Sequence, residues 1–209
     1  MQTEMIKAQI FAFCFYFLFT ATSLAAGPSS WPPQVGQEFP DIALVDQDGE
    51  TIHISDFKGK VLLIEFTGMN CPACQAFAGG NTGVGPFQNN AVQQGLQSIS
   101  EYCPLYAKGF KLNDPRITYI NILLYDMQME APQPRDAKEW AEHFHFSKDK
   151  NQHVLVPVID KRNNASYNLI PGFQLVDKNF VVRSDSTGHH PRNNLWNELL
   201  PMIPTLIEE

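Results

Sequence analysis

Two cysteines separated by two residues are the part of the sequence best suited to chemistry. They form the segment Cys71-Pro72-Ala73-Cys74. A C-x-x-C pair can cycle between a dithiol and a disulfide, or it can supply two ligands to a metal ion. A structural metal site would need a second pair of ligands, and the sequence has no second C-x-x-C and no H-x3-5-H element. We therefore expect redox chemistry and predict no metal site and no cofactor.

The residues before the pair predict how it is presented. Lys60 to Phe66 form a largely apolar run with one internal carboxylate, as is typical of a central parallel strand buried on both faces. Thr67 to Asn70 then read as a short turn, and Pro72 occupies the first turn of a helix, where proline is favoured. The two cysteines are thus expected at the N-terminus of a helix.

This position predicts a different role for each sulfur. At positions i and i+3 of a helix the two side chains lie on one face within reach of a disulfide. Cys71 is nearest the helix N-terminus, where the helix dipole and unpaired N–H groups lower the pKa of a thiol. Cys71 is therefore expected to attack, and Cys74 to resolve the mixed disulfide.

Glu65 is the carboxylate inside the apolar run. If its strand is central, burial raises the pKa of Glu65, and the carboxylate can take the proton from Cys74 when that sulfur attacks. The alternative is a carboxylate at the end of the strand that faces solvent. The apolar residues on both sides favour burial.

The N-terminus has the layout of a secretory signal peptide. Lys7 precedes the apolar run Ile10 to Phe19, and the small residues Ala21 to Ala26 follow. We expect residues 1–26 to be a cleaved signal, with an uncleaved membrane anchor as the alternative. Both interpretations predict that residues 27–209 are exported, with the periplasm as the expected compartment.

Composition limits the remaining possibilities. The chain has 209 residues, of which 44% are hydrophobic and 18% charged, and a net charge of −7. Residues 27–209 are therefore expected to form a single domain with its own core. The acidic balance argues against nucleic acid as a partner. Removal of the signal leaves only Cys71, Cys74 and Cys103. Three cysteines are too few for a disulfide scaffold, and an odd number cannot all form pairs.

Further segments, in this order along the chain, carry a family resemblance. They are Gly36 to Ile42, Asp48 to Thr51, Asp56 to Lys60, the cysteine pair, and Ile170 to Asn179. The sequence resembles the thioredoxin-fold superfamily, and within it the exported thiol-disulfide oxidoreductases related to TlpA and to the redoxins. The resemblance implies an α/β fold: a thioredoxin-like three-layer sandwich with a mixed central sheet, an N-terminal β-hairpin extension and an insertion after the active-site helix.

The resemblance also implies roles at the site. Thioredoxins carry a buried acid behind the second cysteine, which corresponds to Glu65, and a cis-proline facing the pair, which corresponds to Pro171. A proline there leaves the backbone of Ile170 free to pair with an extended substrate; an ordinary Pro-Gly turn is the alternative. Asn70 stands where thioredoxins usually have Trp, so the surface that meets substrate is more polar. The implied partners are protein thiols or disulfides and an upstream redox protein.

The rest of the chain predicts alternating helices and strands. The expected elements are a helix over Asn90 to Cys103 ended by Pro104, a strand over Ile117 to Tyr125, a helix over Arg135 to Phe146, an extended segment over Val154 to Ile159, strands over Phe173 to Val176 and Phe180 to Ser184, and a helical segment over Asn194 to Ile207 interrupted by Pro201 and Pro204.

Gly79 to Pro86 break the active-site helix, as a mobile excursion or a plain surface insertion. Cys103 is expected to be a buried apolar side chain, with an interchain disulfide or a third exchange thiol as alternatives.

Two other functions remain open from the sequence. One is a thiol peroxidase of peroxiredoxin type, because the N-terminal hairpin also resembles that group. Against it, peroxiredoxins have Thr three residues before the reactive cysteine, whereas Thr67 lies four before Cys71. The other is a copper-binding, metallochaperone-like module that would use Cys71, Cys74 and a histidine of the His189-His190 pair.

Overall fold

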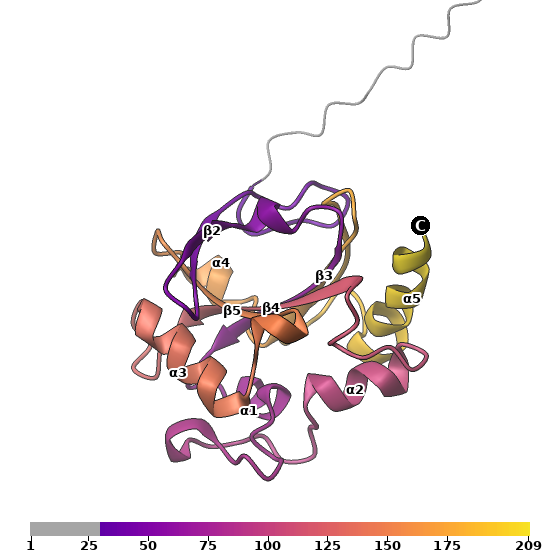
Figure 1. Ribbon diagram of the computed structural model, residues 1–209. Coiled ribbons are helices and arrows are strands. Elements are labelled where there is room, and N and C mark those ends of the chain that lie inside the picture. The colour runs from indigo at the N-terminus through magenta and orange to yellow at the C-terminus, as the bar shows by residue number, and fades with distance from the viewer. Residues whose placement is uncertain (1–29) are drawn as a thin grey trace, which may run out of the picture.

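A single mixed sheet of seven strands organises the protein, in the order β2-β1-β5-β4-β3-β6-β7 (Figure 1). The computed structural model describes residues 30–209, so the expected signal peptide, or anchor, lies outside the described residues. The strands are β1 (Ala43–Asp46), β2 (Thr51–His53), β3 (Val61–Gly68), β4 (Ile117–Tyr125), β5 (Gln152–Pro157), β6 (Gly172–Val176) and β7 (Val182–Thr187).

The two central strands, β3 and β4, are buried along their whole length. They run parallel to each other, and β6 pairs with β3 on its other side in antiparallel orientation. Runs of Val, Ile and Leu are typical of strands covered on both faces, and the strand Ile117–Tyr125 is confirmed. Thr67 and Gly68 were expected in a turn, but they pair with β4 and extend β3.

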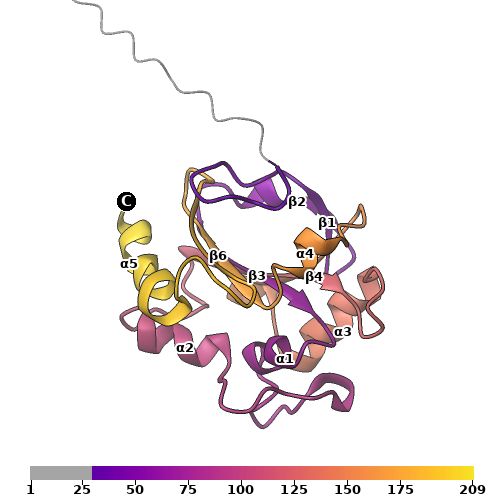
Figure 2. The same cartoon turned by 180° about the vertical axis from the view of Figure 1, so that it is seen from behind.

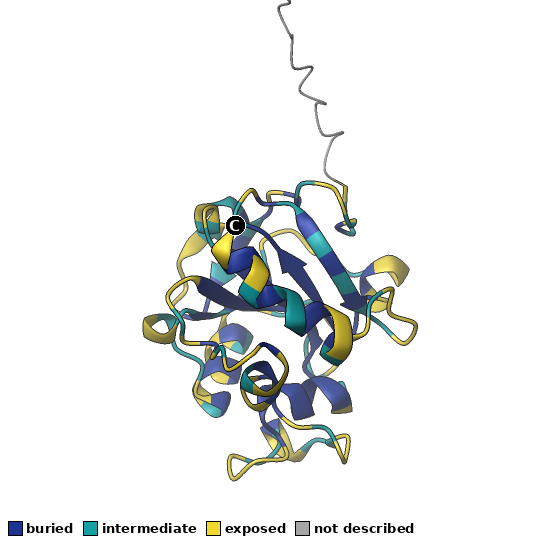
Figure 3. Ribbon diagram, turned by 90° about the vertical axis from the view of Figure 1, so that its right-hand side faces the viewer, coloured by how far each residue is buried: buried dark blue, intermediate teal, exposed yellow. Residues whose placement is uncertain are grey.

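Four of the five α-helices that the structure describes cover one face of this sheet (Figures 1 and 2). The helical elements are α1 (Pro72–Ala78), α2 (Ile99–Tyr106), α3 (Pro134–Phe144), α4 (Asn164–Tyr167) and α5 (Leu200–Glu208), with a single π-helical turn over Leu195–Leu199 before α5. Residues of α1, α2 and α5 share one apolar cluster with Leu63 and Tyr119, and α3 shares another with Leu123 and Val154. β3, β4 and β6 are buried at every residue, whereas α5 exposes one side (Figure 3).

The N-terminal part of the described chain covers the other face. β1 and β2 form a hairpin whose turn contains Asp48 and Gly49, and β1 joins the sheet beside β5. Phe39, Ile42 and Ile54 pack there in one apolar cluster with β3 and β4 residues. The expected N-terminal hairpin and the mixed three-layer fold are thus confirmed, with irregular chain and α4 forming the third layer.

The expected helix over Asn90 to Cys103 is wrong in its first half. Residues 90–98 are irregular, and α2 begins only at Ile99, where Ser98 and Glu101 form a capping box. Backbone groups of this irregular part form hydrogen bonds with other segments of the chain: the Gln93 N–H donates to the Pro72 carbonyl at 2.9 Å. Pro104 was expected to end the helix, yet it lies inside α2; a proline removes one helical hydrogen bond and need not stop the last turn.

The remaining expected elements differ at their ends. α3 begins at Pro134 and ends at Phe144, and β5 ends at Pro157, which leaves Ile159 71% exposed in a loop. β7 runs from Val182 to Thr187, beyond the expected end at Ser184. Within residues 30–209, no helix is both long and apolar enough to cross a bilayer.

Candidate active site

The two cysteines open α1 directly after the central strand β3. Cys71 is the N-cap residue of α1, and its Sγ accepts the N–H of Cys74 at 3.2 Å. Pro72 occupies the first helical turn, as expected. Cys71 is partly exposed, whereas Cys74 is fully buried. The geometry therefore presents one sulfur to the surroundings and encloses the other.

This difference in burial separates the two thiols chemically. A hydrogen bond from the Cys74 thiol, aided by the N–H groups of Cys74 and Ala73, holds the pKa of Cys71 below its ordinary value. Burial, together with the neighbouring Cys71 and Glu65, raises the pKa of Cys74 well above its ordinary value. Thiolate character is therefore concentrated on the exposed sulfur.

Glu65 lies on β3 behind the pair and has 0% of its surface exposed. Burial raises the pKa of Glu65 from 4.5 to about 8, although a hydrogen bond from Tyr119 opposes the shift. One carboxylate oxygen, Oε2, accepts both the Tyr119 O–H and the Asn121 side-chain N–H, the latter at 3.0 Å. The buried position expected for this residue is observed, and a carboxyl group with such a pKa can take up or release a proton near neutral pH.

A cavity of about 530 Å³ opens in front of Cys71. The three predicted substrate-contacting residues Asn70, Ile170 and Pro171 all line it. Most of its other wall residues are apolar: Pro72, Ala73, Phe77, Leu96, Met129, Phe173, Leu195 and Trp196 are among them. No Asp, Glu, Lys or Arg side chain lines the cavity, within residues 30–209. An uncharged, largely apolar segment fits such a surface.

The segment around Pro171 lines the same cavity as Cys71. The Ile170-Pro171 peptide bond is cis, as the resemblance implied. The Ile170 N–H, however, donates to the Tyr167 carbonyl at 3.1 Å, so the carbonyl of Ile170, and not its N–H, remains as the pairing group. Gly172 has no room for a side chain, because a Cβ would lie 2.3 Å from Thr187 Cα. β6 and β7 thus approach closely at the cavity edge.

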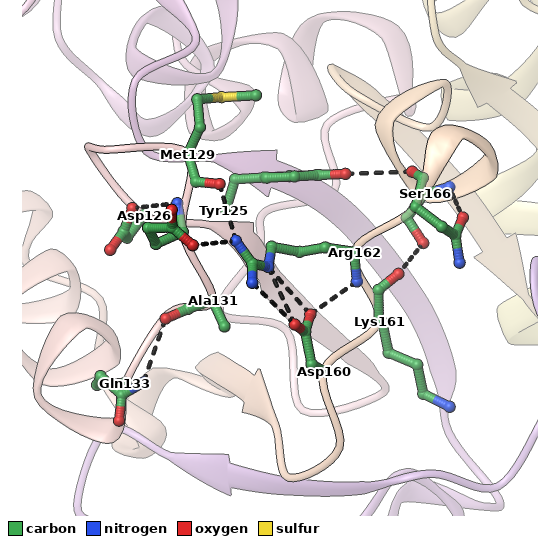
Figure 4. Close-up of polar contacts among 11 residues, drawn as sticks. Tyr125, Asp126, Met129, Ala131, Gln133, Asp160, Lys161, Arg162 and Ser166 are labelled. Carbon is green, nitrogen blue, oxygen red and sulfur yellow. Dashed lines mark hydrogen bonds and ion pairs between the residues drawn. The ribbon is translucent and has the colours of Figure 1, made fainter.

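A cluster of polar contacts holds another wall in place (Figure 4). Arg162 donates to the Met129 carbonyl at 3.0 Å and also pairs with Asp160 and Glu130. Met129 and Tyr167 contribute side chains to the cavity. The Arg162 cluster therefore joins the loop after β4 to the loop before α4 at the rim of the site.

The insertion after α1 is anchored to the core by Gln75. This fully buried side chain donates to the Met69 carbonyl at 2.6 Å and accepts the Phe87 N–H at 2.8 Å. His143 on α3 contacts the Gly85 carbonyl at 3.0 Å. The stretch Gly79 to Pro86 is thus tied to α1 and α3, which favours the surface insertion over the mobile excursion.

The sequence did not single out Tyr119 and Asn121, which contact Glu65, although both were placed in the correct strand. Their signal was available: two polar side chains two residues apart, on one face of an otherwise apolar strand. Met129, Tyr167 and Trp196 were also missed, because the loop, short helix and π-helical turn that bring them to the cavity are far apart in sequence.

Cys103 and the histidine pair lie differently with respect to the site. Cys103 is fully buried on α2, and burial raises its pKa to about 12, as expected of a side chain that serves packing. His189 lines the cavity near Cys71. In the part of the chain that the structure describes, no group of three His, Cys, Asp or Glu side chains is arranged to hold a metal ion.

Comparison with protein families and solved structures agrees with this architecture. The sequence model of the Redoxin family matches residues 34–82, which include both cysteines. Comparison with curated proteins found no match. The fold is similar to BsSco, a member of the Sco family of cytochrome c oxidase assembly proteins, with a TM-score of 0.51 and 16% identity over 82% of this chain and 94% of that one.

Two further structures show the same fold. A SCO1/SenC family lipoprotein from Bacillus anthracis str. Ames gives a TM-score of 0.50 at 15% identity, over 81% of this chain and 94% of that one. A protein from Bacteroides thetaiotaomicron, provisionally described as a protein disulfide isomerase, gives 0.50 at 15% identity, over 84% of this chain and 91% of that one. At these identities the likeness establishes the fold.

The chain therefore has the thioredoxin fold. Its redoxin-type segment carries the Cys71 and Cys74 pair at the start of α1, an arrangement suited to thiol-disulfide exchange.

Proposed function

We propose that this protein is an exported oxidoreductase that exchanges disulfides with cysteine-bearing segments of other proteins. In this proposal Cys71 attacks, Cys74 resolves the mixed disulfide, and Glu65 moves the proton. The proposal is carried by one observation: Cys71 opens onto a cavity of about 530 Å³ with its pKa lowered, whereas Cys74 behind it is fully buried.

The forward reaction has two steps. The Cys71 thiolate attacks a substrate disulfide, forms a mixed disulfide and releases one substrate sulfur as a thiolate. Cys74 then attacks the Cys71 sulfur, passes its proton to Glu65 and expels the second substrate sulfur. The substrate disulfide is reduced and the protein pair is oxidised; the upstream redox protein reverses this change. The reverse sequence oxidises a substrate dithiol.

The cavity supports a protein substrate. Asn70, Ile170 and Pro171 line the same cavity as Cys71, so an extended chain could lie beside the cysteine and donate a main-chain N–H to the Ile170 carbonyl. Export is proposed from the N-terminal sequence alone, with the periplasm as the compartment. An oxidising compartment is also where disulfide exchange with other proteins is needed.

The test is turnover of a peptide disulfide with a dithiol as electron donor. We expect Cys71→Ser to reduce the rate at least a thousandfold, and Cys74→Ser to accumulate a covalent adduct with the substrate, detected by mass spectrometry. Cys103→Ala is the matched control and should retain activity, because Cys103 is buried on α2 away from the cavity. Turnover by Cys71→Ser would refute the assignment.

The likeness to Sco family structures favours one second candidate, a metal-binding module. It would use Cys71, Cys74 and His189, of which Cys71 and His189 line the same cavity. The described residues do not form a ready three-ligand group, so binding would require a rearrangement. Equilibrium dialysis with Cu(I) tests it: stoichiometric binding that is lost in His189→Ala would favour this candidate, and rapid consumption of peroxide would favour the peroxidase instead.

A further inference from the structure

Three polar side chains form a closed cluster beneath the cysteine pair. Glu65 on β3 and Tyr119 and Asn121 on β4 are each 0% exposed. We call these three residues the acid cluster. The Asn121 side-chain nitrogen lies 3.0 Å from Glu65 Oε2 and 3.1 Å from the Tyr119 hydroxyl oxygen, and the Tyr119 O–H donates to the same Oε2. Both donors therefore converge on one oxygen of the carboxyl group.

The other oxygen, Oε1, is treated differently. It is buried and has no hydrogen-bond partner within residues 30–209. The titratable groups that influence Glu65 are Tyr119 and Cys71, and Cys74 in turn responds to the charge of Glu65. No cation is paired with the carboxyl group in this part of the chain. An ionised Glu65 thus depends on the two donors at Oε2 and on the nearby Thr67 side chain, which also lowers the pKa of Glu65.

The strand register fixes this arrangement. β3 and β4 pair in parallel so that Leu63 stands opposite Tyr119 and Glu65 opposite Asn121. Successive residues of a strand alternate between its faces, so Tyr119 and Asn121 share the face on which Glu65 lies. Rotation of Glu65 is restricted because both donors belong to the fully buried neighbouring strand.

We propose that Tyr119 is a positioning residue: together with Asn121 it donates hydrogen bonds to Glu65 Oε2 and so stabilises the ionised carboxylate. The other oxygen, Oε1, is then the atom that accepts the proton of Cys74. This inference rests on the proposed function, since it concerns the resolving step. In that step the Cys74 proton goes to Oε1, the Cys74–Cys71 bond forms, and the bond from Cys71 to the substrate sulfur breaks. The bonding electrons leave with the substrate thiolate.

A loss of the Tyr119 hydroxyl should appear as a change in pH dependence. Phenylalanine keeps the ring but removes one donor to the carboxylate, which destabilises the ionised form relative to the protonated one. We expect Tyr119→Phe to slow the resolving step about tenfold at pH 7, because one pKa unit corresponds to a tenfold change in the ionised fraction. At high pH the rate should approach that of the unmodified protein.

The experiment measures the resolving step alone. Cys71 of the full chain is converted to a mixed disulfide with 2-nitro-5-thiobenzoate, and release of the coloured thiolate by Cys74 is followed by stopped flow from pH 5 to pH 10. We expect the midpoint of the rate profile to lie about one unit higher in Tyr119→Phe. Tyr102→Phe is the matched control, because Tyr102 is also buried on the helix-covered face but its hydroxyl accepts the Gln97 N–H. Its midpoint should not move.

Two further measurements keep the proposal open to refutation. In a Glu65→Gln background, Tyr119→Phe should produce no additional shift. If Tyr119→Phe does not fold, Tyr119 is replaced by 3-fluorotyrosine and the same pH–rate profile is measured. The hydroxyl of 3-fluorotyrosine is more acidic and therefore a stronger donor, so it should lower the midpoint of the profile. An unchanged midpoint, including a uniform slowing at all pH values, overturns the positioning role. The proposed function fails separately, through turnover by Cys71→Ser.

Discussion

Among residues 30–209 three carboxylates are buried, and two of them, Asp46 and Glu65, have opposite surroundings. Asp46 at the end of β1 is 1% exposed, and Glu65 on β3 is 0% exposed. Asp46 Oδ1 accepts the N–H groups of Asp48 and Glu50, each at 2.9 Å, and its Oδ2 accepts from Lys148 at 2.7 Å. Every acceptor position of Asp46 therefore faces a donor, and one of these donors carries a positive charge.

Within residues 30–209, Glu65 has neither a paired cation nor a main-chain donor. Its two donors are the neutral groups of Tyr119 and Asn121, and its Oε1 stays without a partner among the described residues. Burial alone would raise the pKa of both acids. The hydrogen bonds of Asp46 outweigh burial and leave its pKa below 3.8, whereas burial prevails at Glu65 and raises its pKa to about 8. The partners of a buried acid, and not its burial, decide whether it stabilises the fold or exchanges protons.

The largest expected effect concerns the pH dependence of stability at Glu65. Its pKa is raised from 4.5 to about 8 by folding, so the protonated form stabilises the native state below pH 4.5. This stability is lost as the pH rises through 8, by up to about 5 kcal/mol. In urea unfolding of the reduced protein, Glu65→Gln should abolish this slope and be more stable than the unmodified protein at pH 9. Equal slopes in both proteins would contradict the comparison.

A smaller effect of opposite sign is expected at Asp46. Asp46→Ala removes an acceptor from two main-chain N–H groups and from Lys148, and we expect a loss of about 3 kcal/mol at pH 7. Because folding lowers the pKa of Asp46, its contribution is present above pH 3.8 and is lost as the pH falls through the lowered value. Chemical denaturation at pH 7 and pH 3 measures both.

The exposed partner of the same lysine provides the control for this prediction. Asp48 is 2.8 Å from Lys148, but its side chain is 60% exposed. Asp48→Ala should therefore cost less than about 1 kcal/mol. If Asp48→Ala and Asp46→Ala cost the same, the distinction between the two carboxylates does not depend on burial.

An effect of similar size depends on the salt concentration and distinguishes Asp46 from Glu65. Lys148 is 31% exposed, so its attraction to Asp46 is partly screened by ions. Lys148→Met should cost about 1 kcal/mol in dilute buffer and less in 1 M NaCl. The rate midpoint of the resolving step, which reports Glu65, should not respond to this substitution. A shift of that midpoint in Lys148→Met would show that the two sites are coupled.

Local sequence signals predicted the elements that carry the cysteines. The apolar run before Cys71 and the proline after it were sufficient for β3 and α1, because both signals depend only on neighbouring residues. The burial of Glu65 followed from the same run. The partners of Glu65 could not be predicted in this way, since Tyr119 reaches it only through the β3–β4 register. Contacts between distant strands have no local signature.

The helix predicted over Asn90 to Cys103 is wrong in its first half for a related reason. Its apolar spacing suited a helix, but the backbone of residues 90–97 is held by distant groups. Asn81 donates its side-chain N–H to the carbonyls of Gln93 and Leu96, both at 2.8 Å, and the Gln93 N–H reaches Pro72. These bonds replace helical ones. The cavity rim at Leu96 is therefore a product of tertiary contacts that periodicity does not encode.

Gln75 has a consequence for how this protein could be altered. Its amide joins the end of β3 to Phe87 through the interior, so the chain on either side of the exposed stretch Asn81 to Val84 is fixed independently. Extra residues, such as an epitope or a fluorophore-binding peptide, could be inserted between Gly83 and Val84, so that Asn81, which holds Gln93 and Leu96 at the cavity rim, stays in place. The protein thus offers a permissive attachment point a short distance along the chain from its reactive sulfur.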